Sequence, residues 1–452
     1  MTTLILMLNL LDLRGVTDFT GRLPRPSVDE EGPVEVVRGI LSEVQSRGDQ
    51  ALREFTSRFD GVELSDLRVS AEEMQSALLS LAPELRKALE LARDRIADHH
   101  RSQLQEPVDH GGDGVHIRSY RTPVERAGCY VPGGRAAYPS TLLMTAVPAL
   151  VAGVQEVVVC VPADKATGRV AAVTLAAAAL AGVTEVYAIG GAQAIAAMAY
   201  GTESIAAVDV ICGPGNKYVA IAKQQVATRV GVAAAFAGPS EVVVIADETV
   251  PATFAAIDVI LQAEHGPDGL AWLITWEESV AESVTSEVER LTEASPRRAE
   301  IAATLAEGGY AVLVDSPEAA LQVSNLVAPE HLELLCRDAE ALVPLIKNAG
   351  AVFVGPWSPA SVGDYVAGPS HVLPTFGTAR FASALTVDDF LKQHHIISVD
   401  ESAYDPGGIA GAVEALADAE GLTAHADSIR LRDAALASGE FGSITPASTS
   451  KN

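Results

Sequence analysis

Two kinds of hydrophobic pattern divide the chain near residue 120. Before that point, residues 33–58 and 71–104 carry apolar side chains at helical spacing among alternating charges, and predict helices separated by an Asp60-Gly61 turn. After it, short β-branched runs alternate with alanine-rich stretches of helical character. The predicted strands cover residues 156–161, 185–190, 208–212, 241–247, 271–275, 310–315 and 351–355.

Continuous apolar strands separated by helices are typical of parallel sheets covered on both faces. The sequence therefore predicts an α/β fold with doubly wound parallel sheets. A local repeat agrees with this, because Ala-Gly-Val-Gln-Glu-Val at 152–157 returns as Ala-Gly-Val-Thr-Glu-Val at 181–186, as expected of successive αβ units. Residues 355–395 break the pattern with Gly, Pro, Ser and aromatic residues, which favours a functional loop. Helical periodicity resumes after Gly408.

Composition and charge narrow the possible partners. The chain has 452 residues, with 32 Lys and Arg against 59 Asp and Glu, and a formal net charge of −27. This acidity argues against nucleic acid and against an anionic membrane surface as partners. The 4 cysteines are scattered without a CxxC pair, which favours a reducing compartment. Since no apolar run reaches the about 18 residues of a membrane span and the N-terminus lacks signal-peptide features, we expect a cytoplasmic protein.

Residues 211–226 combine a strand, a Gly-Pro-Gly turn and the start of a helix. Such a turn presents free backbone N–H groups and Lys217 at the place where open α/β sheets bind anions. A plain tight turn is the alternative, although Gly-Pro-Gly-Asn-Lys is more elaborate than a turn requires. The chain has neither the G-x-G-x-x-G fingerprint nor the G-x-x-x-x-G-K-[ST] loop, so a standard nucleotide motif does not support this site.

Several polar groups could form a metal or proton-transfer site. Gln262 and His265 lie three residues apart at the end of a predicted helix, which puts two donors on one face. The adjacent Glu330 and His331 offer a carboxylate that can activate water and a base whose pKa is near neutrality. Asp364 lies in the Gly-rich loop, where an acid is usually a turn former. Taken singly, each of these signals is more typical of ordinary surface sequence than of a functional site.

Taken together, these segments resemble the histidinol dehydrogenases. The resemblance runs from about residue 8 to about residue 432 and follows the order of the family's motifs. It is carried by ERAGCYVPGGRAAYPSTLLM (125–144), IGGAQAIAAMAYGT (189–202), CGPGNKYV (212–219), AGPSEVVVIAD (237–247), LQAEHGPDG (261–269), APEHLEL (328–334), SVGDYVAGPSHVLPT (361–375) and EGLTAHADSIRLR (420–432).

The resemblance implies a zinc- and NAD-dependent four-electron oxidation of L-histidinol to L-histidine through bound L-histidinal, the last two steps of histidine biosynthesis. It implies Glu330 as the residue that activates water and His331 as the general base. The implied zinc ligands, one ion per subunit, are Gln262, His265, Asp364 and His425. The implied substrate contacts are Ser240, Gln262, His265, Glu330, His331, Asp364, His371, Glu420 and His425. The implied NAD contacts are Tyr130, Gln193 and Asn216.

The resemblance also implies two Rossmann-like domains without the glycine fingerprint, an N-terminal arm, and a small C-terminal helical domain that reaches across a homodimer with shared active sites. We assign residues 1–32 to the arm and residues 33–130 and 238–385 to the first α/β domain, which carries the metal and catalytic residues. The remaining assignments are 131–237 to the NAD-side domain, 386–440 to the C-terminal domain and 441–452 to a disordered tail.

Two other functions stay open on the residues alone. A zinc-dependent hydrolase would use the metal site and the Glu-His pair, but it would leave the Gly-Pro-Gly-Asn-Lys turn without a purpose. A cofactor-free protein that binds a small ligand would show tight binding without turnover. Formation of NADH from histidinol and NAD distinguishes the dehydrogenase from both.

Overall fold

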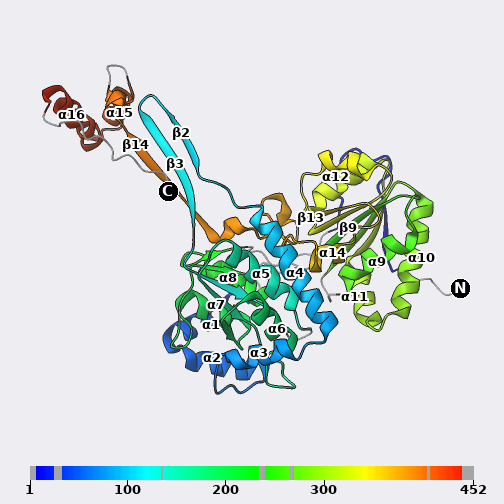
Figure 1. Cartoon of the computed structure of the whole chain (residues 1–452). Helices are drawn as coiled ribbons and strands as arrows, with labels where there is room; N and C mark the ends of the chain where they lie inside the picture. The colour runs from blue at the N-terminus through cyan, green and yellow to red at the C-terminus, as the bar shows by residue number, and fades with distance from the viewer. Residues whose placement is uncertain are drawn as a thin grey trace. The chain divides into compact units, whose positions relative to one another are not determined.

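The computed structural model describes residues 7–24, 33–133, 136–233, 240–264, 266, 269–404 and 408–439 (Figure 1). His265 and the tail at 441–452 therefore lie outside the described residues, as do parts of the arm. The chain forms two compact units. The larger unit contains residues 1–104 and 123–390, and the smaller unit contains residues 105–122 and 391–452. Within the described ranges, no helix combines the length and the apolar character needed to cross a bilayer.

The larger unit contains a parallel sheet of six strands in the order β1-β11-β10-β9-β12-β13. The strands are β1 (Asn9–Asp12), β9 (Glu241–Ala246), β10 (Leu270–Thr275), β11 (Gly309–Leu313), β12 (His331–Leu335) and β13 (Ala351–Val354). From β9 the chain moves outward through β10 and β11, and then returns to the other side of β9 through β12. The sheet is therefore doubly wound, and its topological switch point lies between β9 and β12.

Helices cover both faces of this sheet because its strands are apolar on both sides. Val242 and Val244 of β9 pack beneath helices α9 (Ala252–Ala263), α10 (Glu278–Ala294) and α11 (Arg298–Gly308). Val243 and Ile245 lie on the opposite face, in a core shared with α12 (Pro317–Val327) and α13 (Ala339–Leu342). Figure 1 shows α12 and α9 on opposite sides of the sheet.

Part of the N-terminal arm is built into this sheet. Strand β1 pairs in parallel with β11 at the sheet edge. Leu8 on one face, and Leu13 and Phe19 on the other, are buried in the cores of the sheet. The described portion of the arm is therefore a structural element of the first α/β core.

A second parallel sheet in the larger unit has the order β6-β5-β4-β7-β8. Its strands are β4 (Arg126–Tyr130), β5 (Glu156–Cys160), β6 (Glu185–Tyr187), β7 (Val210–Cys212) and β8 (Gly231–Val232). Helices α7 (Gly191–Tyr200) and α8 (Lys217–Val226) cover one face, and α5 (Pro139–Val151) and α6 (Ala172–Ala181) form the layer on the other. The two sheets share one winding pattern, which confirms the prediction of two Rossmann-like halves.

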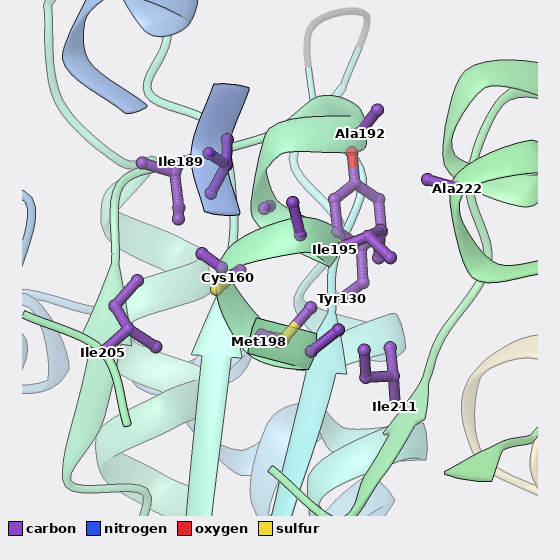
Figure 2. Close-up of a cluster of buried hydrophobic side chains, with 14 of the residues drawn as sticks. Tyr130, Cys160, Ile189, Ala192, Ile195, Met198, Ile205, Ile211 and Ala222 are labelled. Carbon is purple, nitrogen blue, oxygen red and sulfur yellow. The ribbon is translucent and has the colours of Figure 1, made fainter. Parts of the chain in front are cut away.

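The N-terminal helices pack on this second sheet, whereas residues 33–130 were expected to join the first. Val37, Leu52 and Leu67 share a core with Val158 of β5 and with helix α7. Figure 2 shows Ile195 and Met198 of α7 in this core. The elements are α1 (Val34–Arg47), α2 (Asp49–Phe55), the π-helical turn η1 (Thr56–Asp60), α3 (Ala71–Leu79) and α4 (Pro83–Arg101). The expected boundary differs because helical periodicity shows which face is apolar, but not which sheet that face covers.

The smaller unit combines a three-stranded sheet with two helices. Its sheet has the order β14-β3-β2, and the hairpin of β2 and β3 is antiparallel. The elements are β2 (Val108–Gly112), β3 (Val115–Pro123), β14 (Leu391–Val399), α15 (Ile409–Ala419) and α16 (Thr423–Ser438). Arg430 of α16 forms ion pairs with Glu414 and Asp418 of α15 and so connects the two helices. The segment expected as a helical domain at 386–440 thus also contains a strand, which pairs with the hairpin of residues 108–123.

Candidate active site

Five of the candidate residues meet at the amino-terminal edge of the six-stranded sheet. Glu330 and His331 lie at the start of β12, and Gln262 lies in the last turn of α9. Asp364 lies in the short helix α14 (Ala360–Tyr365), and His371 lies in the loop that follows. Helix α9 runs back from the end of β9, so its carboxyl end arrives at the edge where β12 begins. Open α/β sheets usually bind ligands at the other edge, which makes this placement unusual for the fold.

Glu330 and His331 form a buried acid–base pair. Glu330 Oε2 accepts hydrogen bonds from the backbone N–H of Glu241 at 3.1 Å and from Gln262 Nε2 at 3.4 Å, and it lies 3.9 Å from His331 Nδ1. Burial raises the pKa of the Glu330 carboxyl. Burial alone would lower the pKa of His331, but the neighbouring Glu330 and Asp364 outweigh it and raise that pKa. The pKa values of both members of the pair are therefore shifted upward.

The His331 imidazole is held in place on several sides. Its Nδ1 lies 3.4 Å from the backbone carbonyl of Glu241 and 3.2 Å from Gln262 Nε2, and its ring stacks on Phe353 with centroids 6.0 Å apart. Its Nε2 lies 3.4 Å from Asp364 Oδ1 and makes no hydrogen bond. In the tautomer with the proton on Nδ1, this N–H is donated to the Glu241 carbonyl and the Gln262 amide donates to Glu330 alone. Nε2 is then the nitrogen that can accept a proton.

His371 extends the site towards the second sheet. Its Nδ1 donates to the backbone carbonyl of Asp364 at 2.9 Å, and its Nε2 accepts from the hydroxyl of Thr141 at 3.1 Å. Thr141 lies in the first turn of α5, directly after the carboxyl end of β4. Nearby, the hydroxyl of Ser370 donates to the carbonyl of Met144 in the same helix at 2.9 Å. The amino edge of the first sheet therefore meets the carboxyl edge of the second.

Two of the four expected metal ligands flank the same imidazole. Gln262 and Asp364 lie on opposite sides of His331, and Gln262 Oε1 is buried without a hydrogen-bond partner. An orphaned amide oxygen beside a carboxylate fits an oxygen- and nitrogen-ligated zinc ion. The carboxyl end of helix α9, which carries the negative end of the helix dipole, also favours a cation here. Among the described residues, no three His, Cys, Asp or Glu side chains form a complete metal cluster.

The other expected contacts are placed differently. Ser240 lies half-buried just before β9, and its backbone carbonyl accepts a hydrogen bond from the N–H of Leu270. Glu420 and His425 belong to the smaller unit, where both are exposed around the turn between α15 and α16. His265 lies outside the described residues. The geometry of the larger unit thus brings together Gln262, Glu330, His331, Asp364 and His371.

The residues expected to contact NAD surround the switch point of the second sheet. The Tyr130 side chain extends from the end of β4 towards the start of α7, and its hydroxyl accepts a hydrogen bond from the N–H of Gly191 at 3.0 Å (Figure 2). Gln193, in the same first turn, is buried and its Nε2 has no partner. Asn216 is exposed and caps helix α8, since its Oδ1 accepts from the N–H groups of Tyr218 and Val219 at 3.0 and 3.2 Å.

The Gly-Pro-Gly turn is supported by a lysine that sequence reasoning missed. Lys223 of α8 is 2% exposed, and its amino group donates to the carbonyl of Gly213. Burial lowers the pKa of Lys223 to about 8. Gly213 has φ of 103° and lies so close to Tyr130 that an added Cβ would be 2.0 Å from the Tyr130 carbonyl oxygen. The turn therefore depends on a glycine and on a buried cation, whereas the predicted Lys217 is exposed.

Comparison with known proteins assigns the chain to a family. A family model described as histidinol dehydrogenase matches residues 23–433. The histidinol dehydrogenase of Parasynechococcus marenigrum (strain WH8102) is 49% identical over 405 residues, 89% of this chain and 91% of that protein. That of Moorella thermoacetica (strain ATCC 39073) is 45% identical over 431 residues, 94% of this chain and 100% of that protein. A crystal structure of histidinol dehydrogenase from Elizabethkingia anophelis matches with a TM-score of 0.91 at 34% identity, over 95% of this chain and 99% of that chain. The chain belongs to the histidinol dehydrogenase family.

Proposed function

We propose that this protein uses zinc and NAD to oxidise L-histidinol to L-histidine through bound L-histidinal, in a four-electron reaction that completes histidine biosynthesis. Family membership supports an oxidoreductase of histidine biosynthesis. One observation carries the finer proposal. Glu330, Gln262 and Asp364 surround the buried imidazole of His331. His331 is the base of this set, Glu330 is its second proton-transfer group, and Gln262 and Asp364 offer oxygen ligands. An alcohol oxidation assisted by a metal requires groups of these kinds.

Gln262, His265, Asp364 and His425 would hold one zinc ion per subunit, and Tyr130, Gln193 and Asn216 would contact NAD. A bound zinc ion would offer positions to nitrogen donors of histidinol and would so orient the substrate. NAD supplies the hydride acceptor. Ser240, His371 and Glu420 would complete the substrate contacts. The partners of His371 on both ring nitrogens fix its orientation, as expected of a residue that positions substrate.

In the first oxidation, His331 Nε2 takes the proton of the substrate hydroxyl as hydride leaves the carbinol carbon. The aldehyde stays in the site, where retention protects it from side reactions. Glu330 then takes a proton from water as the oxygen of that water adds to the aldehyde carbon, and His331 returns its proton to the aldehyde oxygen, which gives the hydrate and restores His331 as a base. His331 accepts the hydroxyl proton of the hydrate as the second hydride leaves. The histidine carboxylate is the product.

The stoichiometry of NADH formation tests this proposal. With NAD in excess and histidinol limiting, we expect two NADH per histidinol, followed by absorbance at 340 nm, and one zinc per subunit by elemental analysis. A yield of one NADH per histidinol would show that the reaction stops at the first oxidation, and would refute the four-electron reaction. If no NADH forms, hydrolysis by the protein would favour a zinc hydrolase, and binding without turnover would favour a ligand-binding protein. A preparation without zinc that is fully active would exclude the metal role.

We also propose that the protein is a homodimer whose active sites are shared between subunits. Glu420 and His425 are exposed on the smaller unit, apart in sequence from the α/β core that carries the other proposed ligands. The same unit exposes large apolar side chains, including Ile397, Leu416 and Leu431. A solvated apolar face with two unpaired site residues fits a surface that docks on a second copy.

A mixed dimer tests the shared site. One subunit carries His331→Asn and the other carries His425→Ala, and each variant alone is expected to be nearly inactive. If the smaller unit completes the partner's site, one site in the mixed dimer collects both defects and the other is wild type. Activity should then return when the two variants are co-refolded. Inactive mixtures in which mixed dimers are shown by native mass spectrometry would refute the shared site.

A further inference from the structure

Beneath the candidate site, two carboxyl groups are buried against each other. Glu333 of β12 is 0% exposed and Asp258 of α9 is 6% exposed, and the two carboxyl groups are close enough to share a proton in a hydrogen bond. Two carboxyl groups can form this bond only when one of them keeps a proton. Burial and then the proximity of Asp258 raise the pKa of Glu333 to about 9, and burial also raises the pKa of Asp258, which favours one proton held by the pair.

Each member of the pair is the neighbour of a site residue on the same face of its strand or helix. Glu333 follows His331 by two positions on β12, so both side chains lie on the same side of the strand. Asp258 precedes Gln262 by four positions on α9, so these side chains are neighbours on one face of the helix. The pair therefore connects the strand that carries the base to the helix that carries a proposed zinc ligand.

Glu333 also contacts the element that carries a second proposed ligand. Its Oε1 accepts a hydrogen bond from the N–H of Ala360 at 3.1 Å. Ala360 begins α14, whose N-terminus has no side-chain cap, and Asp364 follows one turn later. The other carboxyl oxygen, Oε2, is buried without any donor and is the atom available to carry the proton.

We propose that Asp258 and Glu333 are positioning residues. Their buried pair ties α9, β12 and α14 together and so sets the distances between Gln262, His331 and Asp364. Packing alone does not explain two carboxyl groups at this place, because apolar side chains of equal volume would fill it without desolvating a charge. The inference rests on the proposed function only in treating Gln262 and Asp364 as zinc ligands. Residues that orient metal ligands typically contribute about 10- to 100-fold to metal affinity.

Two substitutions of similar size separate positioning from mere volume. Glu333→Gln keeps an oxygen that accepts from Ala360 and adds an amide that donates to the Asp258 carboxylate, so it imitates the protonated acid. Glu333→Met fills a similar volume with no hydrogen-bonding group that can serve both partners. Hydrogen exchange followed by mass spectrometry on the metal-free protein reports on α14 without zinc or substrate. We expect faster exchange of the peptide 358–366 in Glu333→Met, and wild-type exchange in Glu333→Gln.

Zinc affinity, measured by competition with a chelating indicator, gives the second readout. We expect Glu333→Met to lower the affinity at least tenfold and Glu333→Gln to change it less than threefold. Asp247→Ala is the matched control. Asp247 is also 6% exposed and fixes a loop by accepting from the N–H of Arg337 at 2.8 Å, but it lies at the opposite end of β9. This control should lose stability and keep wild-type zinc affinity.

Three results would overturn the inference: wild-type exchange and zinc affinity in Glu333→Met, equal losses in Glu333→Gln and Glu333→Met, or an equal loss of zinc affinity in Asp247→Ala. If Glu333→Met does not fold, Asp258→Ala replaces it, and unchanged exchange and zinc affinity in that variant would refute the positioning role. A wild-type protein that neither retains zinc nor reduces NAD with histidinol would refute the proposed function instead. The exchange experiment on metal-free protein would still decide whether the pair holds α14.

Discussion

Substituting Gly213 by alanine should damage the second sheet and its proposed NAD site together. At φ of 103° an L side chain is strained, and its Cβ would lie 2.0 Å from the carbonyl oxygen of Tyr130. Since ordinary Cβ contacts begin near 3.4 Å, the ends of β4 and β7 must separate by about 1 Å. Left-handed strain costs about 1–2 kcal/mol, and a disrupted ladder hydrogen bond costs about 0.5–1.5 kcal/mol more. We therefore expect a loss of about 2–3 kcal/mol in the free energy of unfolding.

Gly182→Ala provides the matched control for this prediction. Gly182 has φ of 85° at the end of α6, but an added Cβ would find no atom within 4 Å, so only the backbone strain remains. Denaturant unfolding should show Gly213→Ala to be less stable than Gly182→Ala. Steady-state kinetics should show a KM for NAD raised at least tenfold in Gly213→Ala alone, with the KM for histidinol near wild type. Equal stability of the two variants, or an unchanged KM for NAD, would refute the close approach of β4 and β7 as the basis of the site.

Three further outcomes are expected. His331→Asn should slow both oxidations about 100-fold or more. Glu330→Gln should slow the oxidation of supplied histidinal more than that of histidinol. If Glu330→Gln slows both oxidations equally in single-turnover measurements of NADH, water activation by Glu330 is contradicted. Asn216→Ala should lose about 1 kcal/mol of helix capping and should raise the KM for NAD. Asn216→Ser should restore the stability, because serine also caps helices, but it should not restore the KM. If Asn216→Ser restores both, Asn216 acts only as a helix cap and does not contact NAD. Burial raises the pKa of Asp60 to about 6 from an unfolded value near 3.8, so ionised Asp60 destabilises the fold above that pH; Asp60→Asn should stabilise the protein by up to about 3 kcal/mol at pH 8 and have little effect at pH 4, as measured by denaturant unfolding.

The sequence predicted the strands of the two sheets where the strands are continuously apolar. The expected runs at 156–161, 241–247 and 351–355 correspond to β5, β9 and β13 within one residue at each end. Strand β12 was not predicted, because Glu333 interrupts its apolar run and a buried acid looks like a surface position in sequence. The hairpin of β2 and β3 was missed for a related reason. None of its residues is buried, and apolar and polar side chains alternate only over residues 115–118, which is too short a run to mark a hairpin.

The site residues were recognisable by type, but their mutual arrangement was not. Gln262 and Asp364 are separated by a hundred residues, and only the return of α9 and the packing of α14 bring both to His331. Their supporting residues carried no signal at all. Thr141 and Lys223 look like ordinary helix residues in sequence, and their roles follow from the partners that tertiary structure provides. Long-range contacts of this kind cannot be derived from local periodicity.

The two edges that meet in the larger unit have opposite electrostatic character, and this matches the two proposed ligands. At the amino edge of the first sheet, α9 presents its carboxyl end, where the helix dipole and the orphaned Gln262 oxygen favour a cation. At the carboxyl edge of the second sheet, α7 and α8 present their amino ends beside Gly191 and Asn216, where backbone N–H groups favour an anion. A chain with a net charge of −27 repels a dinucleotide at long range, so local donors of this kind are required to bind one. The hydrogen bond between Thr141 and His371 joins the two edges, and hydride transfer from a metal-held alcohol to a dinucleotide needs such a junction.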